Sequence, residues 1–164
     1  MDLGSYLEHD GRPAVRFERT YPHPIERVWP AVSEPDQLAA WFPSKVAIEP
    51  RVGGTVEFSG DTNVDDTTGL VLAYDPPNRL AFTWGGDEIH VELNAVDERH
   101  CRLVLLNVLE DRSAAARNGA GWSLCLAALD ASLNQTTADD TPWRAYYDAY
   151  LANGVPSGAP VPGQ

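Results

Sequence analysis

Short runs of alternating apolar and polar residues fill the stretch from Lys45 to Glu110, and this pattern constrains the fold more than any other feature. A period of two residues places successive side chains on opposite faces of a strand. Residues that favour turns separate the runs, at Arg51–Gly54, Ser59–Gly69, Asp75–Asn78, Gly85–Asp87 and Asp97–His100. Because strands joined by short turns pair antiparallel, the stretch predicts an antiparallel meander with one strongly apolar face.

The pattern changes to a helical period after Glu110. Four large apolar residues follow one another at intervals of four, three and four positions, namely Trp122, Leu126, Leu129 and Leu133. This spacing places them on one face of a helix. We therefore predict a long amphipathic helix ending near Gln135, with an irregular start at residues 118–121 because glycine is a poor helix former.

One strand and two short helices are predicted before the meander. Residues 14–21 alternate like a half-buried strand. Pro24 suits the first position of a helix, and apolar residues at helical spacing follow it. A second short helix is expected over residues 36–42, because Pro43 stops it. Residues 1–13 are polar and show no period, so we expect an irregular segment there.

A C-terminal extension over residues 136–164 follows the long helix. Thr141 suits a helix cap and Pro142 a first helical position, so we predict a helix over residues 141–153. The sequence beyond this helix is rich in proline and glycine. We expect it to form a mobile tail.

The predicted C-terminal helix carries an apolar stripe that must dock on another surface. The stripe consists of Trp143, Tyr146, Tyr147, Tyr150 and Leu151. The strand over residues 102–108 offers a partner, because Val104 and Leu106 are apolar on a face that a solvent-exposed strand fills with polar residues. We expect the helix to cover this outer face of the sheet, within one chain or across a homodimer.

Composition and charge bound the class of protein. A chain of 164 residues suits one domain, and its net charge of −12 repels nucleic acid and anionic membranes. No run approaches ~18 consecutive apolar residues, and the first residues lack the basic and apolar pattern of a leader. We expect a soluble, cytoplasmic protein with neither nucleic acid nor a membrane as a partner.

The residues that most often hold metals and cofactors show no matching spacing. Cys101 and Cys125 fit neither a disulfide framework nor a metal site, so we expect reduced thiols. The histidines and carboxylates have no metal-ligand spacing, and Gly53–Gly54 lacks a phosphate-loop signature. We therefore expect no metal and no cofactor.

Five motifs follow one another in an order that resembles a known family. They are Pro24–Val32, Asp36–Pro43, Gly53–Phe58, Asp75–Trp84 and Gly121–Trp122. They resemble the family named after the activator of the 90-kilodalton heat-shock protein's ATPase, within the START-like helix-grip superfamily. The resemblance implies an α+β domain over residues 14–135, in which a curved antiparallel sheet wraps around a long C-terminal helix.

The resemblance leaves three functions open. Stand-alone relatives look like small-ligand binders or stress-associated proteins, so the leading hypothesis is binding of a small, largely apolar molecule. The second is a cyclase or hydro-lyase that uses the same cavity, and the third is a co-chaperone-like interaction module. The eukaryotic co-chaperone has a second domain for which 164 residues leave no room, so we do not expect chaperone activation.

A closed apolar cavity between the sheet and the long helix is expected to hold the ligand. Its predicted lining combines aromatic and aliphatic residues with one amide: Trp41, Phe58, Trp84, Leu105, Asn107, Trp122, Cys125, Leu126 and Leu129. Asn107 shares a strand face with Leu105 and is the main polar group of the set. Core packing of the tryptophans, and an amide that satisfies backbone groups or water, remain open as alternatives.

No residue is assigned a catalytic role. His90 and Glu92 lie two positions apart on one strand, and such a pair in a cleft could supply an acid and a base. They alternate with apolar residues, however, so they face solvent if those residues face the cavity. Cys125 lies in the middle of a helix between two leucines, a setting that favours packing over a nucleophilic role.

Overall fold

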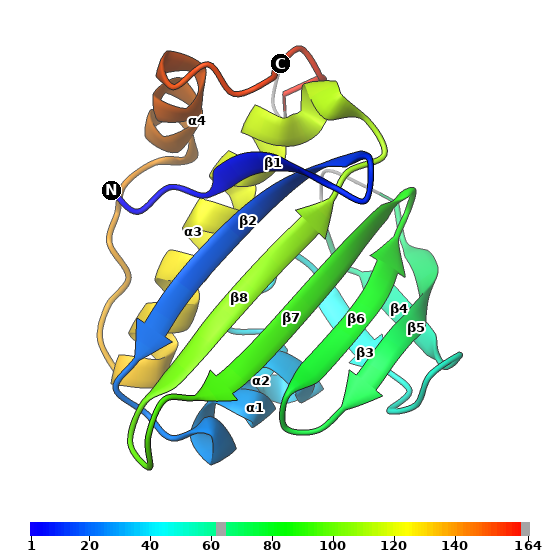
Figure 1. Cartoon of the computed structure of the whole chain (residues 1–164), viewed down its shortest axis with the longest axis vertical. Helices are drawn as coiled ribbons and strands as arrows, with labels where there is room; N and C mark the ends of the chain where they lie inside the picture. The colour runs from blue at the N-terminus through cyan, green and yellow to red at the C-terminus, as the bar shows by residue number, and fades with distance from the viewer. Residues whose placement is uncertain (62–64, 162–164) are drawn as a thin grey trace.

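A curved antiparallel sheet forms one wall of the molecule (Figure 1). The computed structural model describes residues 1–61 and 65–161, and within them the sheet has eight strands in the order β1-β2-β8-β7-β6-β5-β4-β3. The strands are β1 (Ser5–His9), β2 (Arg12–Tyr21), β3 (Lys45–Ile48), β4 (Thr55–Ser59), β5 (Thr67–Asp75), β6 (Arg79–Trp84), β7 (Asp87–Ala95) and β8 (Cys101–Val108). The predicted antiparallel meander is therefore confirmed.

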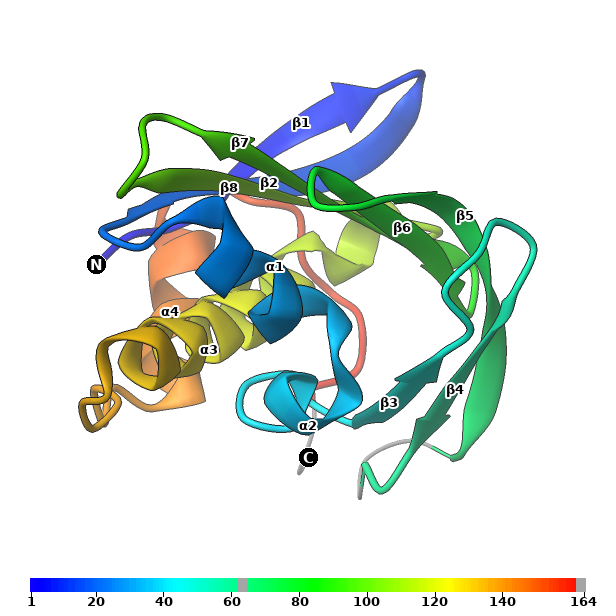
Figure 2. The same ribbon diagram turned by 90° about the horizontal axis from the view of Figure 1, so that it is seen from below.

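The helices α1, α2 and α3 lie in the concave side of the sheet (Figure 2). The helices are α1 (Ile25–Ser33), α2 (Pro35–Leu38), α3 (Ala115–Asn134) and α4 (Trp143–Ala152), with a short 3-10 helix, η1 (Arg112–Ala114), before α3. A sheet that is not closed, wrapped around a long helix near the C-terminus, is the α+β helix-grip fold. The predicted fold class is confirmed.

Cross-strand rows of apolar side chains face α3 and form the core. Phe17 on β2 is paired with Leu105 on β8, which is paired with Val91 on β7, and Leu80 on β6 continues the row. None of these four residues is more than 3% exposed. Cross-strand pairs of this kind stabilise a sheet and fix its register, because a slip of one residue would turn them to the other face.

Five aromatic rings fill the space between the β4–β6 half of the sheet and α3. They belong to Phe42, Phe58, Phe82, Trp84 and Trp122, and the centroids of neighbouring rings are 5.3 to 6.4 Å apart. Aromatic pairs at such separations add to the free energy of burial. We call this group the aromatic cluster.

The prediction of an irregular segment over residues 1–13 is wrong, because β1 pairs with β2 along its whole length. The two strands are joined by Asp10 and Gly11, whose φ angles are 49° and 80°. Positive φ at both central residues is the geometry of the tightest hairpin turn, which favours an Asp-Gly pair. The Asp10–Gly11 pair was therefore the sequence feature that indicated a hairpin within this polar segment.

The helix α4 does not cover the outer face of the sheet, and that prediction is wrong. It packs on α3, on the same side of the sheet as the other helices (Figures 1 and 2). Tyr150 of α4 is fully buried, and a Cβ atom added to Gly119 would lie 2.9 Å from its ring. The helix α3 runs without interruption from Ala115 through Gly119 and Gly121, so the predicted irregular start is also wrong.

The part of the C-terminal tail that the structure describes is bound to the domain, in contrast to the predicted mobile tail. The backbone N–H of Ala116 donates to the carbonyl of Pro156 at 2.9 Å, and that of Ala159 donates to the carbonyl of Ser113 at 3.2 Å. Val155 and Val161 pack against the core. Residues 162–164 lie outside the described residues, so the prediction is untested there.

The hydroxyl of Tyr150 should stabilise the fold, whereas that of Tyr21 should not. The Tyr150 hydroxyl accepts from the Gly4 N–H at 2.7 Å and shares a hydrogen bond with Ser123 Oγ at 2.8 Å, so Tyr150→Phe should lower the free energy of unfolding by about 1–3 kcal/mol. The buried Tyr21 hydroxyl has no partner among the described residues, and burial raises its pKa.

Tyr21→Phe should therefore leave the free energy of unfolding within about 0.5 kcal/mol of the original value, or raise it. Urea unfolding followed by circular dichroism measures both variants. Equal losses for the two tyrosines would contradict the assignment of the Tyr150 hydrogen bonds as stabilising.

Candidate functional site

An open groove with a volume of about 1100 Å³ lies beside the aromatic cluster. One wall is the turn between β6 and β7, from Trp84 to Asp87, and another is the side of α3 from Arg117 to Cys125. Trp143 at the start of α4 also contributes. The groove opens to solvent, so it differs from the predicted closed cavity.

Three of the predicted ligand-binding residues line this groove and six do not. Trp84, Trp122 and Cys125 are in its wall. The others are buried in the core away from the groove lining, namely Trp41, Phe58, Leu105, Asn107, Leu126 and Leu129. The aromatic cluster fills the space between the sheet and α3 where a cavity was predicted. The groove lies at the edge of this cluster.

Trp84 and Trp122 connect the aromatic cluster to the groove. The Trp84 ring stacks on Phe58 at 5.3 Å with an interplanar angle of 15°, and it meets the Trp122 ring edge-on at 6.0 Å. Both indoles are thereby fixed on the core side, because aromatic packing limits their rotamers. The groove thus has a rigid apolar wall.

Asn107 is buried behind the groove wall, where its side chain hydrogen-bonds with residues of the lining. Its Nδ2 donates to Asp87 Oδ2 at 3.0 Å, and its Oδ1 accepts from Asn118 Nδ2 at 3.0 Å and from Trp122 Nε1 at 3.1 Å. The side chain is 1% exposed and uses both ends of the amide within the protein. Asn107 therefore positions Asp87, Asn118 and Trp122, which themselves line the groove.

Asp87 and Asn118 are polar groove residues that sequence reasoning missed. Asp87 accepts from the backbone N–H of Glu110 at 2.9 Å and from Asn118 Nδ2 at 3.2 Å. Two signals could have found them. Asp87 follows the Gly85–Gly86 turn next to Trp84, and Asn118 precedes Trp122 by one helical turn, so both lie beside a predicted groove tryptophan.

Carboxylates outnumber cations in the groove wall. The lining contains four acidic residues, Asp61, Asp65, Asp87 and Glu110, against the single cation of Arg117. Arg117 is occupied, since its Nε donates to Asn118 Oδ1 at 3.1 Å and its Nη1 donates to the carbonyl of Pro160 at 3.2 Å. The groove therefore has a negative potential that favours cations and hydrogen-bond donors.

The groove offers little to covalent chemistry. Burial, together with the charge of Asp61, raises the pKa of the Cys125 thiol to about 12, so the thiol stays neutral at physiological pH. His90 and Glu92 line a hollow on the outer face of the sheet instead of the groove. Within residues 1–61 and 65–161, no cluster of His, Cys, Asp and Glu is arranged to hold a metal ion.

Solved structures share this architecture. A protein of unknown function from Enterococcus faecalis, EF2215, has a TM-score of 0.79 at 21% identity, over 92% of this chain and 89% of that chain. CalU16 from Micromonospora echinospora has a TM-score of 0.70 at 20% identity, over 91% and 94%. The protein encoded by gene BPP1335 from Bordetella parapertussis has a TM-score of 0.70 at 27% identity, over 98% and 92%.

The curved sheet, the gripped helix and the groove between them define a START-like helix-grip protein. The family model for Activator of Hsp90 ATPase homolog 1-like protein matches residues 22–134, and the chain belongs to this family. No curated protein matches the sequence. None of the helices in the described part of the chain is long and apolar enough to span a membrane.

The Asn107 network should depend on the amide NH2 group that donates to Asp87. Asn107→Asp replaces the donor to Asp87 with a second carboxylate, so the free energy of unfolding at pH 7 should fall by about 2–4 kcal/mol. In the folded variant the two neighbouring carboxylates disfavour being charged together, so the pKa of the pair is raised. Stability is therefore lost as the pH rises, and the loss of unfolding free energy should be smaller at pH 4 than at pH 7.

Urea unfolding at the two pH values measures this deficit. Asn94→Asp, at an exposed position on the neighbouring strand β7, is the control and should change the free energy by less than about 0.5 kcal/mol. A deficit that is independent of pH would show that charge repulsion between the two carboxylates is not its cause.

The Cys125 thiol should resist alkylation. Only the thiolate attacks, and the raised pKa of Cys125 makes it scarce, so iodoacetamide should react at pH 8 more slowly than with a free cysteine by a factor on the order of fifty. The rate should rise with pH beyond 10. Mass spectrometry after limited alkylation measures it, with urea-unfolded protein as the control, and rapid alkylation at pH 8 would contradict the buried, neutral thiol.

Proposed function

We propose that this protein binds a small, flat, largely apolar molecule in the groove between α3 and the β6–β7 turn. The observation that carries the proposal is the groove itself, with a volume of about 1100 Å³ and two fixed indoles in its wall. Pockets for drug-sized ligands typically occupy roughly 300–1,000 Å³ and are mostly apolar with few polar groups. The family's fold commonly binds hydrophobic ligands.

The polar end of the ligand is a cation or a hydrogen-bond donor. Asp87 is held by three donors and is rigid, while Asp65 and Glu110 are exposed carboxylates of the same wall. An amine attached to an aromatic body satisfies both parts of the groove, since indole faces also attract cations. The free thiols of Cys101 and Cys125 suit a reducing compartment, so we place this binding in the cytoplasm.

Binding fits the groove better than a cyclase or hydro-lyase reaction does. General acid–base catalysis needs a group that exchanges a proton with the substrate. Both oxygens of Asp87 already accept hydrogen bonds from the protein, and the Cys125 thiol is neutral. No histidine is among the lining residues that the structure describes. Asp87 and Cys125 therefore hold a ligand in place and do not exchange a proton with it.

Calorimetric titration with two matched probes tests the proposal. 1-Naphthylmethylamine carries a positive charge and 1-naphthalenemethanol does not, so the amine should bind about tenfold more tightly. The double variant Asp65→Asn/Glu110→Gln removes two negative charges without touching the Asn107 network, and it should abolish most of this difference. The binding of the alcohol should be unchanged.

Filling the groove is the matched steric test. Cys125→Trp places a large ring in the groove wall and should abolish binding of both probes. Ser132→Trp adds the same ring at an exposed position of α3 and should leave binding intact. If Cys125→Trp binds the probes as well as the original chain does, the ligand site lies elsewhere.

A further inference from the structure

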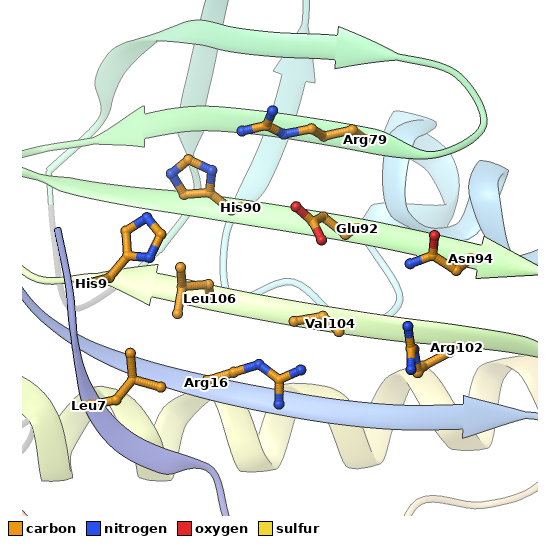
Figure 3. A pocket seen from close by; sticks show the side chains of 10 residues that line it. All are labelled: Leu7, His9, Arg16, Arg79, His90, Glu92, Asn94, Arg102, Val104 and Leu106. Atoms are coloured by element: carbon orange, nitrogen blue, oxygen red, sulfur yellow. The ribbon is translucent and has the colours of Figure 1, made fainter.

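A second hollow lies on the outer face of the sheet, opposite the helices (Figure 3). It has a volume of about 330 Å³ and is lined by side chains of β1, β2, β6, β7 and β8. The helix α4 packs on α3 and leaves this face uncovered by the described residues. It is separate from the proposed ligand groove, with which it shares no lining residue.

The hairpin of β1 and β2 gives the outer face its concave shape. Two strands separate β1 from β7 in the sheet, yet the rings of His9 on β1 and His90 on β7 have centroids only 6.3 Å apart. The strand β1 therefore rises from the sheet on the side away from the helices and forms a wall (Figure 2). Leu7 and His9 point from this wall toward the hollow (Figure 3).

The floor of the hollow is apolar. Val104 and Leu106 on the central strand β8 are half-buried there. Leu106 is paired with Arg16 on β2 on one side and with His90 on β7 on the other. A ligand that reaches the floor therefore meets aliphatic side chains flanked by cationic and imidazole groups.

Arginines concentrate at this hollow in a strongly acidic chain. The chain has a net charge of −12 with 12 lysines and arginines, and three of these, Arg16, Arg79 and Arg102, line the hollow beside the single carboxylate of Glu92. Arginine presents several N–H donors in a planar fork that fits carboxylate and phosphate groups. Among the lining residues that the structure describes, arginines thus outnumber carboxylates three to one, while Glu88 Oε1 contacts His90 Nε2 from outside the lining at 2.9 Å.

These arginines are available to a ligand. Arg79 is paired with Glu92 across the strands, but the described residues give it no ion pair within 4.0 Å. Arg16 Nη1 and Arg102 Nε both lie near the Glu18 carboxylate, at 3.4 and 3.6 Å. The side chains of Arg16, Arg102 and Glu18 are 41 to 49% exposed. Exposed pairs of this kind contribute little free energy, so a bound anion can replace them.

We propose that the outer hollow is a binding site for a small organic anion, a carboxylate or phosphate carried on a short apolar group. The charged end contacts the arginines, and the apolar group contacts Val104 and Leu106. The volume of about 330 Å³ suits a molecule of this size. The site is independent of the groove beside Trp84 and Trp122.

Nuclear magnetic resonance titration of the ¹⁵N-labelled full chain tests the site. Phenyl phosphate and benzoate should each shift the amide resonances of β7 and β8 around the hollow at concentrations up to roughly 10 mM. Benzyl alcohol lacks the charge and inorganic phosphate lacks the apolar group, so each should bind more weakly than the complete probes. The relative affinity of phenyl phosphate and benzoate distinguishes phosphate from carboxylate ligands.

Charge variants give effects of opposite sign. Arg79→Gln removes a donor and should weaken phenyl phosphate binding about tenfold, whereas Glu92→Gln removes a repulsive charge and should tighten it about threefold. Arg99→Gln, at an exposed position in the β7–β8 turn, is the control and should not change the affinity. All of these positions are exposed, so the variants should fold.

Three results would overturn the proposal. They are resonance shifts that appear at Trp84 and Trp122 instead of the outer face, benzyl alcohol binding as tightly as benzoate, and Arg79→Gln and Glu92→Gln changing the affinity in the same direction. Binding at the Trp84–Trp122 groove is measured separately with the naphthalene probes. Failure of one site therefore leaves the test of the other unaffected.

Discussion

The indole of Trp122 joins three parts of this molecule. Its ring packs on Phe42 and Trp84 with centroids 5.5 and 6.0 Å away, its Nε1 donates to Asn107 Oδ1, and its outer side is part of the groove wall. The indole is 4% exposed, so the hydrogen bond to Asn107 satisfies a donor that could not be left buried without cost. This contact, together with the ring packing, ties α3 to the sheet beside the groove.

The helix α3 is also buried on the side that faces α4. Trp122 and Leu126 are buried, as are Gly119 and Ser123, which contact Tyr150 of α4. A helix with large residues toward the sheet and small residues toward α4 is buried on both sides, because small residues allow the second helix to approach closely. The tail extends the layer over the start of α3, through the backbone hydrogen bonds of Pro156 and Ala159. The extension is thus part of the helical layer.

Local sequence patterns predicted the elements well, whereas long-range packing was beyond them. Turn residues and the two periods located the meander and α3, since both signals act over a few positions. The docking partner of α4 depended on Gly119, which reads as a helix breaker in the sequence and serves as a contact surface in the structure. The prediction of a closed apolar cavity differs from the structure for a similar reason. Alternation showed that Phe58 and Leu105 face inward, but it does not tell whether the interior is empty or filled by neighbouring rings.

The register decides which charged side chains reach the groove and which lie on the outer face of the sheet. The turn between β6 and β7 carries Asp87 to the groove, while the outer face of the same strands presents Arg79 and His90. Because side chains alternate along a strand, a single residue of slip would exchange the two sets and bury the charges. The inward row of Leu80, Val91 and Leu105 prevents such a slip. The hydrophobic core therefore fixes the fold and also keeps the carboxylate-rich groove apart from the hollow that Arg16, Arg79 and Arg102 line.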